Sequence, residues 1–379
     1  MKLIPKTLLA AVAVLLAAAS AHADVTVGVS LSLTGPGSGL GLPMQNEFKL
    51  WPKEIAGQKV HLIILDDASD PGKGVNNARR LVTEDKADVV IGSCITPVAA
   101  AMAPVLAEAK TVQLSAAPVG VPPGQDHWLF RLPQGFNVMA YPIVEHMKKQ
   151  GVKTLGFIGY TDAYGELWLK EITKQAEAAG IKVTTVERFA RTDTSVTPQA
   201  LKLAAANPDA ILVVASGSGA AMPEMALVER GYKGKIYQTH AAATQDLMRI
   251  GGKEVEGTYV VSGPAVVAEQ LPDNHPSKAR AIDFVTKYEA AYGKGTRNQF
   301  AGHAYDAAVV LEKAIPIALK KAQPGTAEFR AALRDAIETM GRTVLAHGVM
   351  NWTPEDHWGY TNETGVLLKV ENGQFVVVK

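Results

Sequence analysis

Short apolar runs alternate along the chain with segments in which apolar residues recur every three or four positions. Such runs are typical of buried strands, and the wider spacing is typical of helices that pack on them. In the first part of the chain we predict strands at 25–33, 60–65, 88–91 and 112–114, and helices at 42–55, 74–84 and 98–109. Because these strands are apolar almost throughout, they predict a parallel sheet that is covered on both faces.

A second series of the same kind begins after a predicted helix at 136–150. Its strands are predicted at 154–158, 182–187, 210–214, 236–238 and 258–261, and its helices at 165–179, 198–206 and 222–230. The two series have similar lengths but share no residue-level repeat. We therefore expect two α/β lobes of comparable size.

The pattern changes near the end of the chain. Three helices are predicted in succession, at 278–291, 304–321 and 327–339, and strands follow at 344–349, 366–370 and 375–378. Helices with no strands between them cannot form a third α/β lobe, so we expect them to pack on one of the first two. The chain then crosses between the lobes more than once, which creates a hinge and a cleft where a ligand can bind.

The amino terminus has the three-part layout of a secretory signal. Lys2 and Lys6 precede an apolar run from Leu8 to Ala19, and small residues at 21 and 23 are typical of a cleavage site. The run is shorter than the roughly 20 residues that span a bilayer, and an uncleaved membrane anchor is the alternative. Cleavage before Asp24 takes the basic residues from 38 to 36, against 37 acidic residues. We expect an exported, nearly neutral protein of the periplasm.

Composition narrows the possible classes. The chain has 379 residues, of which 47% are hydrophobic and 20% charged, so it is too apolar for a disordered protein. A formal net charge of +1 gives no electrostatic case for nucleic-acid binding. The single cysteine, Cys94, excludes a disulfide scaffold and a metal site built from several thiolates. We interpret Cys94 as a buried apolar thiol.

Motifs that carry catalysis are missing. The glycine-rich loop at 35–41 follows a predicted strand, but its glycines lack the G-x-G-x-x-G spacing of dinucleotide-binding loops. The chain also lacks the P-loop, G-x-S-x-G and H-E-x-x-H patterns. The acidic stretch at 66–70 lacks the glycine and glutamate of a calcium loop, and we interpret Asp70 and Pro71 as a helix N-cap and first residue. We therefore predict no catalytic residues, no cofactor and no metal site.

Six short stretches together carry a family resemblance. They are VGVSLSLTGP at 27–36, LDDASDP at 65–71, IGS at 91–93 with Thr96, TDAYG at 161–165, GYKG at 231–234 and YDA at 305–307. They resemble the type I periplasmic solute-binding proteins of ABC transporters, in the branched-chain amino-acid-binding (leucine/isoleucine/valine-binding protein-like) group. The resemblance implies two doubly wound parallel-sheet α/β lobes, joined by a hinge of three crossovers, that close over a small solute. We accordingly expect an N-terminal lobe of 24–135 and 275–342, and a C-terminal lobe of 136–274 and 343–379.

The resemblance also implies which residues bind the solute. They are Leu33, Ser93, Thr96, Ser115, Ala117, Tyr164, Ser218 and His240. Thr96 matches the hydroxyl residue that binds a ligand carboxylate, and Tyr164 matches a tyrosine that covers the solute. The local sequence supports an anion at Thr96, because Thr96-Pro97 has the form of an N-cap followed by proline, and helix N-termini favour negative charge. The alternatives are a Thr96 that only caps and a Tyr164 that only packs.

His240 stands near the position where amino-acid binders of this family place a carboxylate against the ligand's ammonium group. No acid follows before Asp246, and we expect Glu224, one helix earlier, to face solvent. A buried ammonium group without a partner is costly. We therefore expect a ligand with a carboxylate and no nearby amine, such as an aromatic or other organic acid, with His240 donating to an oxygen. A loop histidine without a ligand role is the alternative.

These observations predict a binding protein and not an enzyme. It captures a small carboxylate in the cleft between the lobes and delivers it to the membrane permease subunits of an ABC importer. We expect a monomer that closes about its hinge. A binding protein for a branched-chain or other amino acid is the alternative within the family, and an exported α/β enzyme is a more distant one. A partner of a sensor kinase also fits the sequence.

Overall fold

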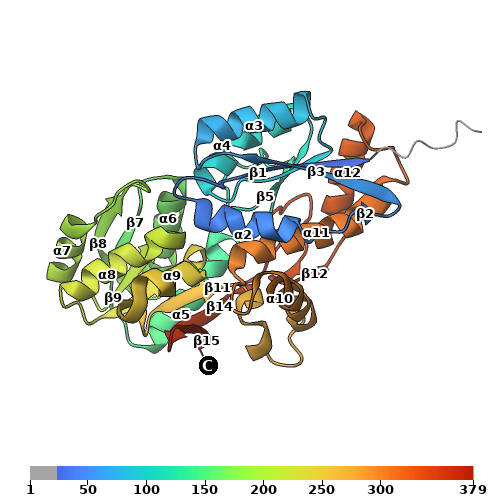
Figure 1. The fold of residues 1–379 in the computed structure, drawn as a ribbon. Coiled ribbons are helices and arrows are strands. Elements are labelled where there is room, and N and C mark those ends of the chain that lie inside the picture. Colours follow the sequence, from blue (N-terminus) through green and yellow to red (C-terminus); the bar gives the residue numbers. More distant parts are fainter. Residues whose placement is uncertain (1–23, 379) are drawn as a thin grey trace, which may run out of the picture.

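Two α/β lobes lie side by side in the computed structural model, each built from a sheet with helices packed against it (Figure 1). The structure describes residues 24–378, so the predicted signal segment at 1–23 lies outside the described residues. The prediction of two parallel-sheet α/β lobes is confirmed.

The first sheet has the strand order β2-β3-β1-β4-β5-β6 and is parallel except for the antiparallel pair β2 and β3 at one edge. Its strands are β1 (Val25–Leu31), β2 (Glu54–Ile55), β3 (Gln58–Asp66), β4 (Val89–Gly92), β5 (Val112–Ser115) and β6 (Leu129–Arg131). Its helices are α2 (Ser38–Phe48), α3 (Pro71–Thr83) and α4 (Thr96–Glu108). Asp70 caps α3 as predicted, because its carboxylate accepts from the Lys73 N–H at 2.7 Å.

The second sheet has the order β15-β14-β11-β10-β9-β7-β8, with β14 and β15 antiparallel to their neighbours. Its strands are β7 (Thr154–Tyr160), β8 (Lys182–Phe189), β9 (Ala210–Val214), β10 (Lys235–Gln238), β11 (Tyr259–Ser262), β14 (Val366–Glu371) and β15 (Gln374–Val377). Its helices are α5 (Phe136–Lys149), α6 (Ala163–Ala178), α7 (Thr197–Ala206), α8 (Ala221–Glu229) and α9 (Gln245–Gly251). Short 3₁₀ helices follow several strands: η1 (Gly217–Ala220), η2 (His240–Ala242), η3 (Gly252–Val255), η4 (Pro264–Gln270) and η5 (Asn362–Thr364).

The chain passes between the lobes three times: after β6, after β11 and after the last helix. Between the second and third passages lie α10 (Lys278–Tyr292), α11 (Gln299–Ala318) and α12 (Ala327–Thr339), and these helices return to the first lobe. Tyr292 donates to the Asn46 carbonyl at 2.8 Å, and the Trp51 indole donates to the Ala304 carbonyl at 3.1 Å. The third passage carries a separate hairpin of β12 (Thr343–Leu345) and β13 (Gly348–Met350). We propose lobe boundaries of 24–135 with 275–342, and 136–274 with 343–379.

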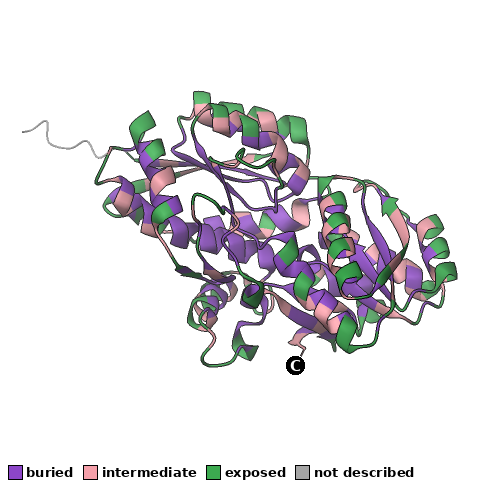
Figure 2. Cartoon of the chain, turned by 180° about the vertical axis from the view of Figure 1, so that it is seen from behind, coloured by how far each residue is buried: buried purple, intermediate pink, exposed green. Residues whose placement is uncertain are grey.

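Figure 2 shows that the central strands of both sheets are buried, while many outward-facing helix positions are exposed. No helix within residues 24–378 combines the length and the apolar character needed to cross a membrane.

The helix predicted at 42–55 is misplaced. It begins at Ser38 and ends at Phe48, and Glu54–Ile55 is a strand. Pro52 accounts for the error at the C-terminal end, because a proline disfavours helical geometry in the residue before it.

In the last part of the chain, the structure differs from the sequence prediction in two places that bear on the ligand site. Helix α11 begins five residues before the predicted start, because the Asn298 side chain accepts from the N–H groups of Phe300 and Ala301. The segment at 344–349, predicted as one strand, is a hairpin that turns at residues 346–347. Gly348 has a φ of 139°, which side-chain-bearing residues rarely adopt. Strand β6 and helix α9 are not predicted from the sequence.

Candidate ligand-binding cavity

A small cavity lies where the two lobes meet. It forms at the carboxyl ends of the parallel strands, the usual ligand position in open α/β sheets. On the side of the first lobe it is lined by Leu40, Cys94, Ile95, Thr96, Ala116, Ala117, Pro118, Pro133, Phe300 and His303. On the side of the second lobe it is lined by Tyr164, Arg191, Ser216, His240 and Ala241. Four of the eight predicted ligand residues line this cavity: Thr96, Ala117, Tyr164 and His240.

Thr96 lines the cavity but is not the N-cap of α4. Ile95 is the N-cap, Thr96 is the first helical residue, and no side chain caps the helix. The Thr96 hydroxyl instead donates to the Pro118 carbonyl at 3.1 Å. This contact joins the start of α4 to the loop after β5, and it leaves the hydroxyl oxygen able to accept a hydrogen bond. The capping interpretation of Thr96 is therefore wrong.

Tyr164 and His240 stand side by side on the second-lobe wall. Asp162 caps α6 by accepting from the Tyr164 and Gly165 N–H groups, which fixes the start of the helix that carries Tyr164. The Tyr164 hydroxyl is 2.8 Å from the Thr239 hydroxyl, and burial raises the pKa of Tyr164. Its ring centre lies 6.0 Å from that of His240.

His240 is buried, and its Nδ1 atom has no hydrogen-bond partner among the described residues. Burial lowers the pKa of His240 to about 3, with a smaller contribution from His347. The ring is therefore neutral at neutral pH and carries one N–H donor and one acceptor nitrogen. An unpartnered buried nitrogen in a cavity wall is a group that a ligand can satisfy.

Among the described residues, Arg191 is the only Arg or Lys that lines the cavity. The sequence prediction missed it. Its Nε atom donates to Asp162 at 2.5 Å, and its Nη1 atom donates to the Ser216 hydroxyl at 2.9 Å. Its guanidinium group lies 4.0 Å from the centre of the Tyr160 ring. These contacts leave Nη2 for a ligand carboxylate. The one sequence signal was position, because Arg191 follows a predicted strand of the second series.

The other four predicted residues are not among those that line the cavity. Ser93 donates to Asp67 at 2.7 Å, and Ser115 donates to the Ala117 carbonyl at 2.7 Å, so both hydroxyls serve the first lobe itself. Ser218 is exposed on η1, and Leu33 is half-buried, its N–H donating to Asp66 at 2.9 Å. The side chains of Ser93 and Ser115 thus serve the fold beside the cavity.

The residues that line the cavity include no Asp or Glu within the described part of the chain. The expectation that Glu224 faces solvent is wrong, because Glu224 is only 1% exposed. It accepts from the Gln238 amide at 2.9 Å and from the Thr258 hydroxyl, and burial raises its pKa to about 7. Glu224 thus lies inside the second lobe and is not a cavity residue.

Cys94 is buried in the cavity wall, and burial raises the pKa of its thiol to about 12. Since the thiolate is the reactive form, Cys94 is an unreactive apolar wall residue.

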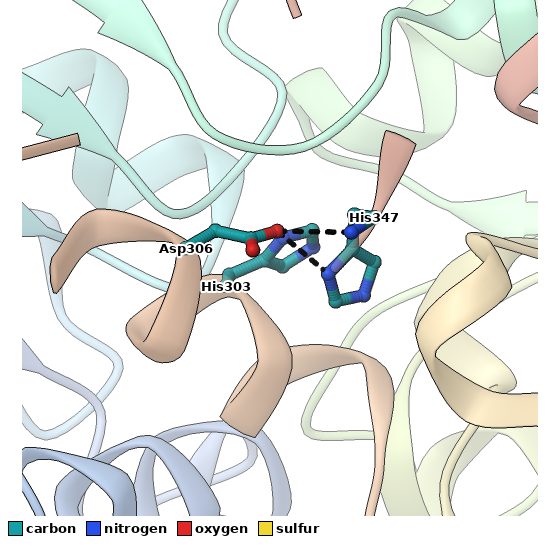
Figure 3. Close-up of side chains that lie close together, drawn as sticks. All are labelled: His303, Asp306 and His347. Carbon is teal, nitrogen blue, oxygen red and sulfur yellow. Dashed lines mark hydrogen bonds and ion pairs between the residues drawn. The ribbon is translucent and has the colours of Figure 1, made fainter. Parts of the chain in front are cut away.

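From His303 in the cavity wall, a fully buried cluster with Asp306 and His347 extends toward the hinge (Figure 3). Asp306 accepts from the Ala346 N–H at 2.7 Å, from the His347 N–H at 3.2 Å and from His347 Nδ1 at 3.0 Å. The rings of His303 and His347 are stacked with their centres 4.3 Å apart. The residue types are those that metals prefer, but both Asp306 oxygens and His347 Nδ1 are occupied by these bonds. We interpret the cluster as an Asp–His pair with a second histidine beside it.

Comparison with known proteins agrees with this architecture. A sequence model of the family described as periplasmic binding protein matches residues 24–374. A search of curated proteins gave no match. An extracellular ligand-binding receptor from Rhodopseudomonas palustris has a TM-score of 0.93 and 48% sequence identity, and the alignment covers 94% of this chain and 100% of that one.

Two more distant structures share the fold. A leucine-binding protein from Thermotoga maritima has a TM-score of 0.78 and 22% identity, with 94% of this chain and 98% of that chain covered. An ABC-transporter solute-binding protein from R. palustris in complex with benzoate has a TM-score of 0.79 and 19% identity, with 94% and 95% covered. The family model spans nearly all of the described residues, and the chain belongs to the periplasmic binding protein family.

Proposed function

We propose that this protein is the extracytoplasmic solute-binding component of an ABC importer and that its ligand is a small carboxylate, with an aromatic acid as the best fit. The observation that carries the proposal is the charge inventory of the cavity. Among the residues that the structure describes, one guanidinium group, that of Arg191, lines the wall, and no carboxylate does.

This charge inventory favours a carboxylate ligand without an ammonium group over an amino acid. A ligand carboxylate finds a fixed guanidinium group, a charge-assisted pairing that Arg geometry suits. A ligand ammonium group finds no carboxylate among the lining residues, and burying such a charge unpaired is costly. The neutral His240 ring offers a hydrogen bond to an oxygen but no charge to an ammonium group.

The rest of the wall suits a flat apolar body. Apolar side chains approach from both sides: Leu40, Ile95, Ala116, Pro118, Pro133, Ala241 and Phe300. The distant benzoate-binding neighbour from R. palustris supports this ligand class, and the leucine-binding neighbour keeps an amino acid as the alternative.

Hinge closure is the mechanism we propose. The lobes come close beside the cavity, where a Cβ added to Gly39 would lie 2.8 Å from an Asp246 oxygen and a Cβ added to Gly217 would lie 3.0 Å from Leu40. A ligand that contacts Thr96 on one lobe and Arg191 on the other gains contacts only when the lobes are together. It therefore favours the closed state, which is the form that the membrane permease would recognise.

Native mass spectrometry of the protein purified from its periplasm tests the ligand class. We expect a bound small organic acid that is released on unfolding and does not return after refolding in clean buffer. A bound amino acid would overturn the ligand assignment, and chemical conversion of the released compound would revive the exported enzyme. Loss of acid uptake by cells that lack this protein distinguishes an importer from a partner of a sensor kinase.

A further inference from the structure

The hydrogen bonds of two hinge glutamines fix the side-chain orientation of both. Gln299 accepts from the Gly263 N–H at 3.0 Å and from the Ser262 hydroxyl at 2.8 Å, so the atom facing them is its oxygen. Gln134 donates to the His347 carbonyl at 2.7 Å, so the atom facing that carbonyl is its nitrogen. A main-chain N–H can only donate and a main-chain carbonyl can only accept. The oxygen and nitrogen of neither side-chain amide can therefore be exchanged.

With both amides fixed, the proton on His303 is fixed as well. The Gln299 nitrogen lies 3.4 Å from the Gln134 oxygen and 3.3 Å from His303 Nε2. An NH₂ group only donates, so His303 Nε2 must accept. The one proton of the neutral ring then sits on Nδ1. Burial lowers the pKa of His303 well below its usual value, so the neutral ring is the stable form.

His303 Nδ1 is therefore an N–H donor, and it has no hydrogen-bond partner among the described residues. The side chain is 0% exposed and lines the ligand cavity from α11. A buried donor without a partner is costly, and such a group in a cavity wall discriminates strongly against ligands that cannot satisfy it.

We propose that His303 is a specificity-determining residue whose Nδ1–H donates to an acceptor oxygen of the bound solute, and that Gln299 is the positioning residue that sets this tautomer. The inference rests on the proposed function and names the chemistry of the ligand's second polar group. Arg191 and His303 belong to opposite lobes, so a ligand that satisfies both carries its carboxylate at one end and an acceptor oxygen at the other. Gln299 also bonds to Gly263, in the second passage between the lobes, and to Gln134, in the first passage. The residue that sets the His303 tautomer is therefore held by two segments of the hinge.

Two acids of nearly equal shape test the proposal by calorimetry. In 4-acetylbenzoate a carbonyl oxygen stands where 4-isopropylbenzoate has a methyl group. We expect the wild-type protein to bind the acetyl compound about tenfold more tightly, the scale of one satisfied buried donor. His303→Asn keeps a nitrogen donor near the Nδ1 position and should retain the preference. His303→Gln places its donor near the Nε2 position and should lose it. Equal affinity of the wild-type protein for both acids, or an undiminished preference in His303→Gln, overturns the proposal.

A second readout needs no ligand. Nitrogen-15 NMR of histidine-labelled protein should show His303 as the neutral tautomer protonated at Nδ1, and Gln299→Met should shift it toward the Nε2-protonated form. A wild-type ring protonated at Nε2, or a tautomer unchanged in Gln299→Met, overturns the proposal. If benzoate and both substituted acids fail to bind the wild-type protein, the proposed function fails, while the tautomer spectrum still decides whether Gln299 fixes the ring.

Discussion

The guanidinium group of Arg191 lies over the ring of Tyr160, 4.0 Å from the ring centre. A cation so placed is attracted by the ring face, and the bonds from Arg191 to Asp162 and Ser216 hold it in one orientation. All three partners come from the carboxyl ends of second-lobe strands or the loops that follow them. The cavity therefore meets a ligand with a fixed charge, which needs little ordering when the ligand arrives.

Replacing Arg191 should weaken acid binding most. Arg191→Met removes the charge-assisted hydrogen bond and should lower the affinity for benzoate roughly 10- to 150-fold by calorimetry. Arg191→Lys keeps the charge but loses the planar fork and the stacking on Tyr160, so it should restore only part of the affinity.

The matched control is Arg188→Gln. Arg188 pairs with Glu166 on the surface of the same lobe, with the Arg188 side chain 40% exposed, so its loss should leave benzoate affinity unchanged. If Arg191→Met binds benzoate with wild-type affinity, Arg191 is not a ligand-binding residue.

The hydroxyls of Thr96 and Tyr164 should each contribute to affinity. Thr96→Ala breaks the bond to the Pro118 carbonyl, and Tyr164→Phe breaks the contact with Thr239, so each loosens one wall of the cavity. We expect each variant to lose about 5- to 150-fold in benzoate affinity while keeping its circular dichroism spectrum. Thr96→Ser keeps the hydroxyl and serves as the control. Wild-type affinity in both Thr96→Ala and Tyr164→Phe would remove these hydroxyls from the account.

Closure should depend on the absence of a side chain at Gly39. A Cβ added there would lie 2.8 Å from the Asp246 carboxylate of the other lobe, and Gly39→Val adds two further carbons. Overpacking of this kind costs about 1–3 kcal/mol, so ligand affinity should fall roughly 5- to 150-fold. Small-angle X-ray scattering with saturating benzoate should show a more open variant. Leu42→Ala, at an exposed position of the same helix, should close normally. Equal compaction of Gly39→Val and wild type would show that this contact does not limit closure.

The sequence predicts most of the strands and the two lobes because the buried strands are short apolar runs, visible without tertiary context. Thr96 and Tyr164 were reachable because they lie in stretches that carry the family resemblance, and Ala117 and His240 because they match positions where the resemblance implies contact with the ligand. Arg191 was not, since its role comes from Asp162, Tyr160 and Ser216, which only the fold brings to it.

His303 shows the second limit of sequence reasoning. The predicted start of its helix was placed at 304, and the Asn298 cap extends the helix back to include it. Its proton position depends on Gln134 and Gln299, which are far apart in the chain. Glu224 was misjudged because the pattern of α8 does not reveal that β10 and the Thr258 hydroxyl cover it.

Glu47 should make stability depend on pH. It is 4% exposed on α2, and burial raises its pKa from 4.5 to about 8. Between these two pH values the folded protein keeps the proton on Glu47, whereas the unfolded chain has lost it. The contribution of Glu47 to the free energy of unfolding is therefore fully present below pH 4.5 and is lost as the pH rises through 8. Glu47→Gln has no proton to lose. We expect the melting temperature of Glu47→Gln, relative to that of the wild type, to increase as the pH is raised from 5.5 to 8.5. Parallel melting curves across this range would show that Glu47 ionises normally in the folded protein.

The central claim is that the cavity selects a carboxylate without an amine. Isothermal titration calorimetry of the refolded, ligand-free protein against benzoate and against leucine tests it most directly. The account predicts that benzoate binds and that leucine gives no measurable heat of binding, because its ammonium group finds no carboxylate among the described residues that line the cavity. Tight binding of leucine with no binding of benzoate would contradict it.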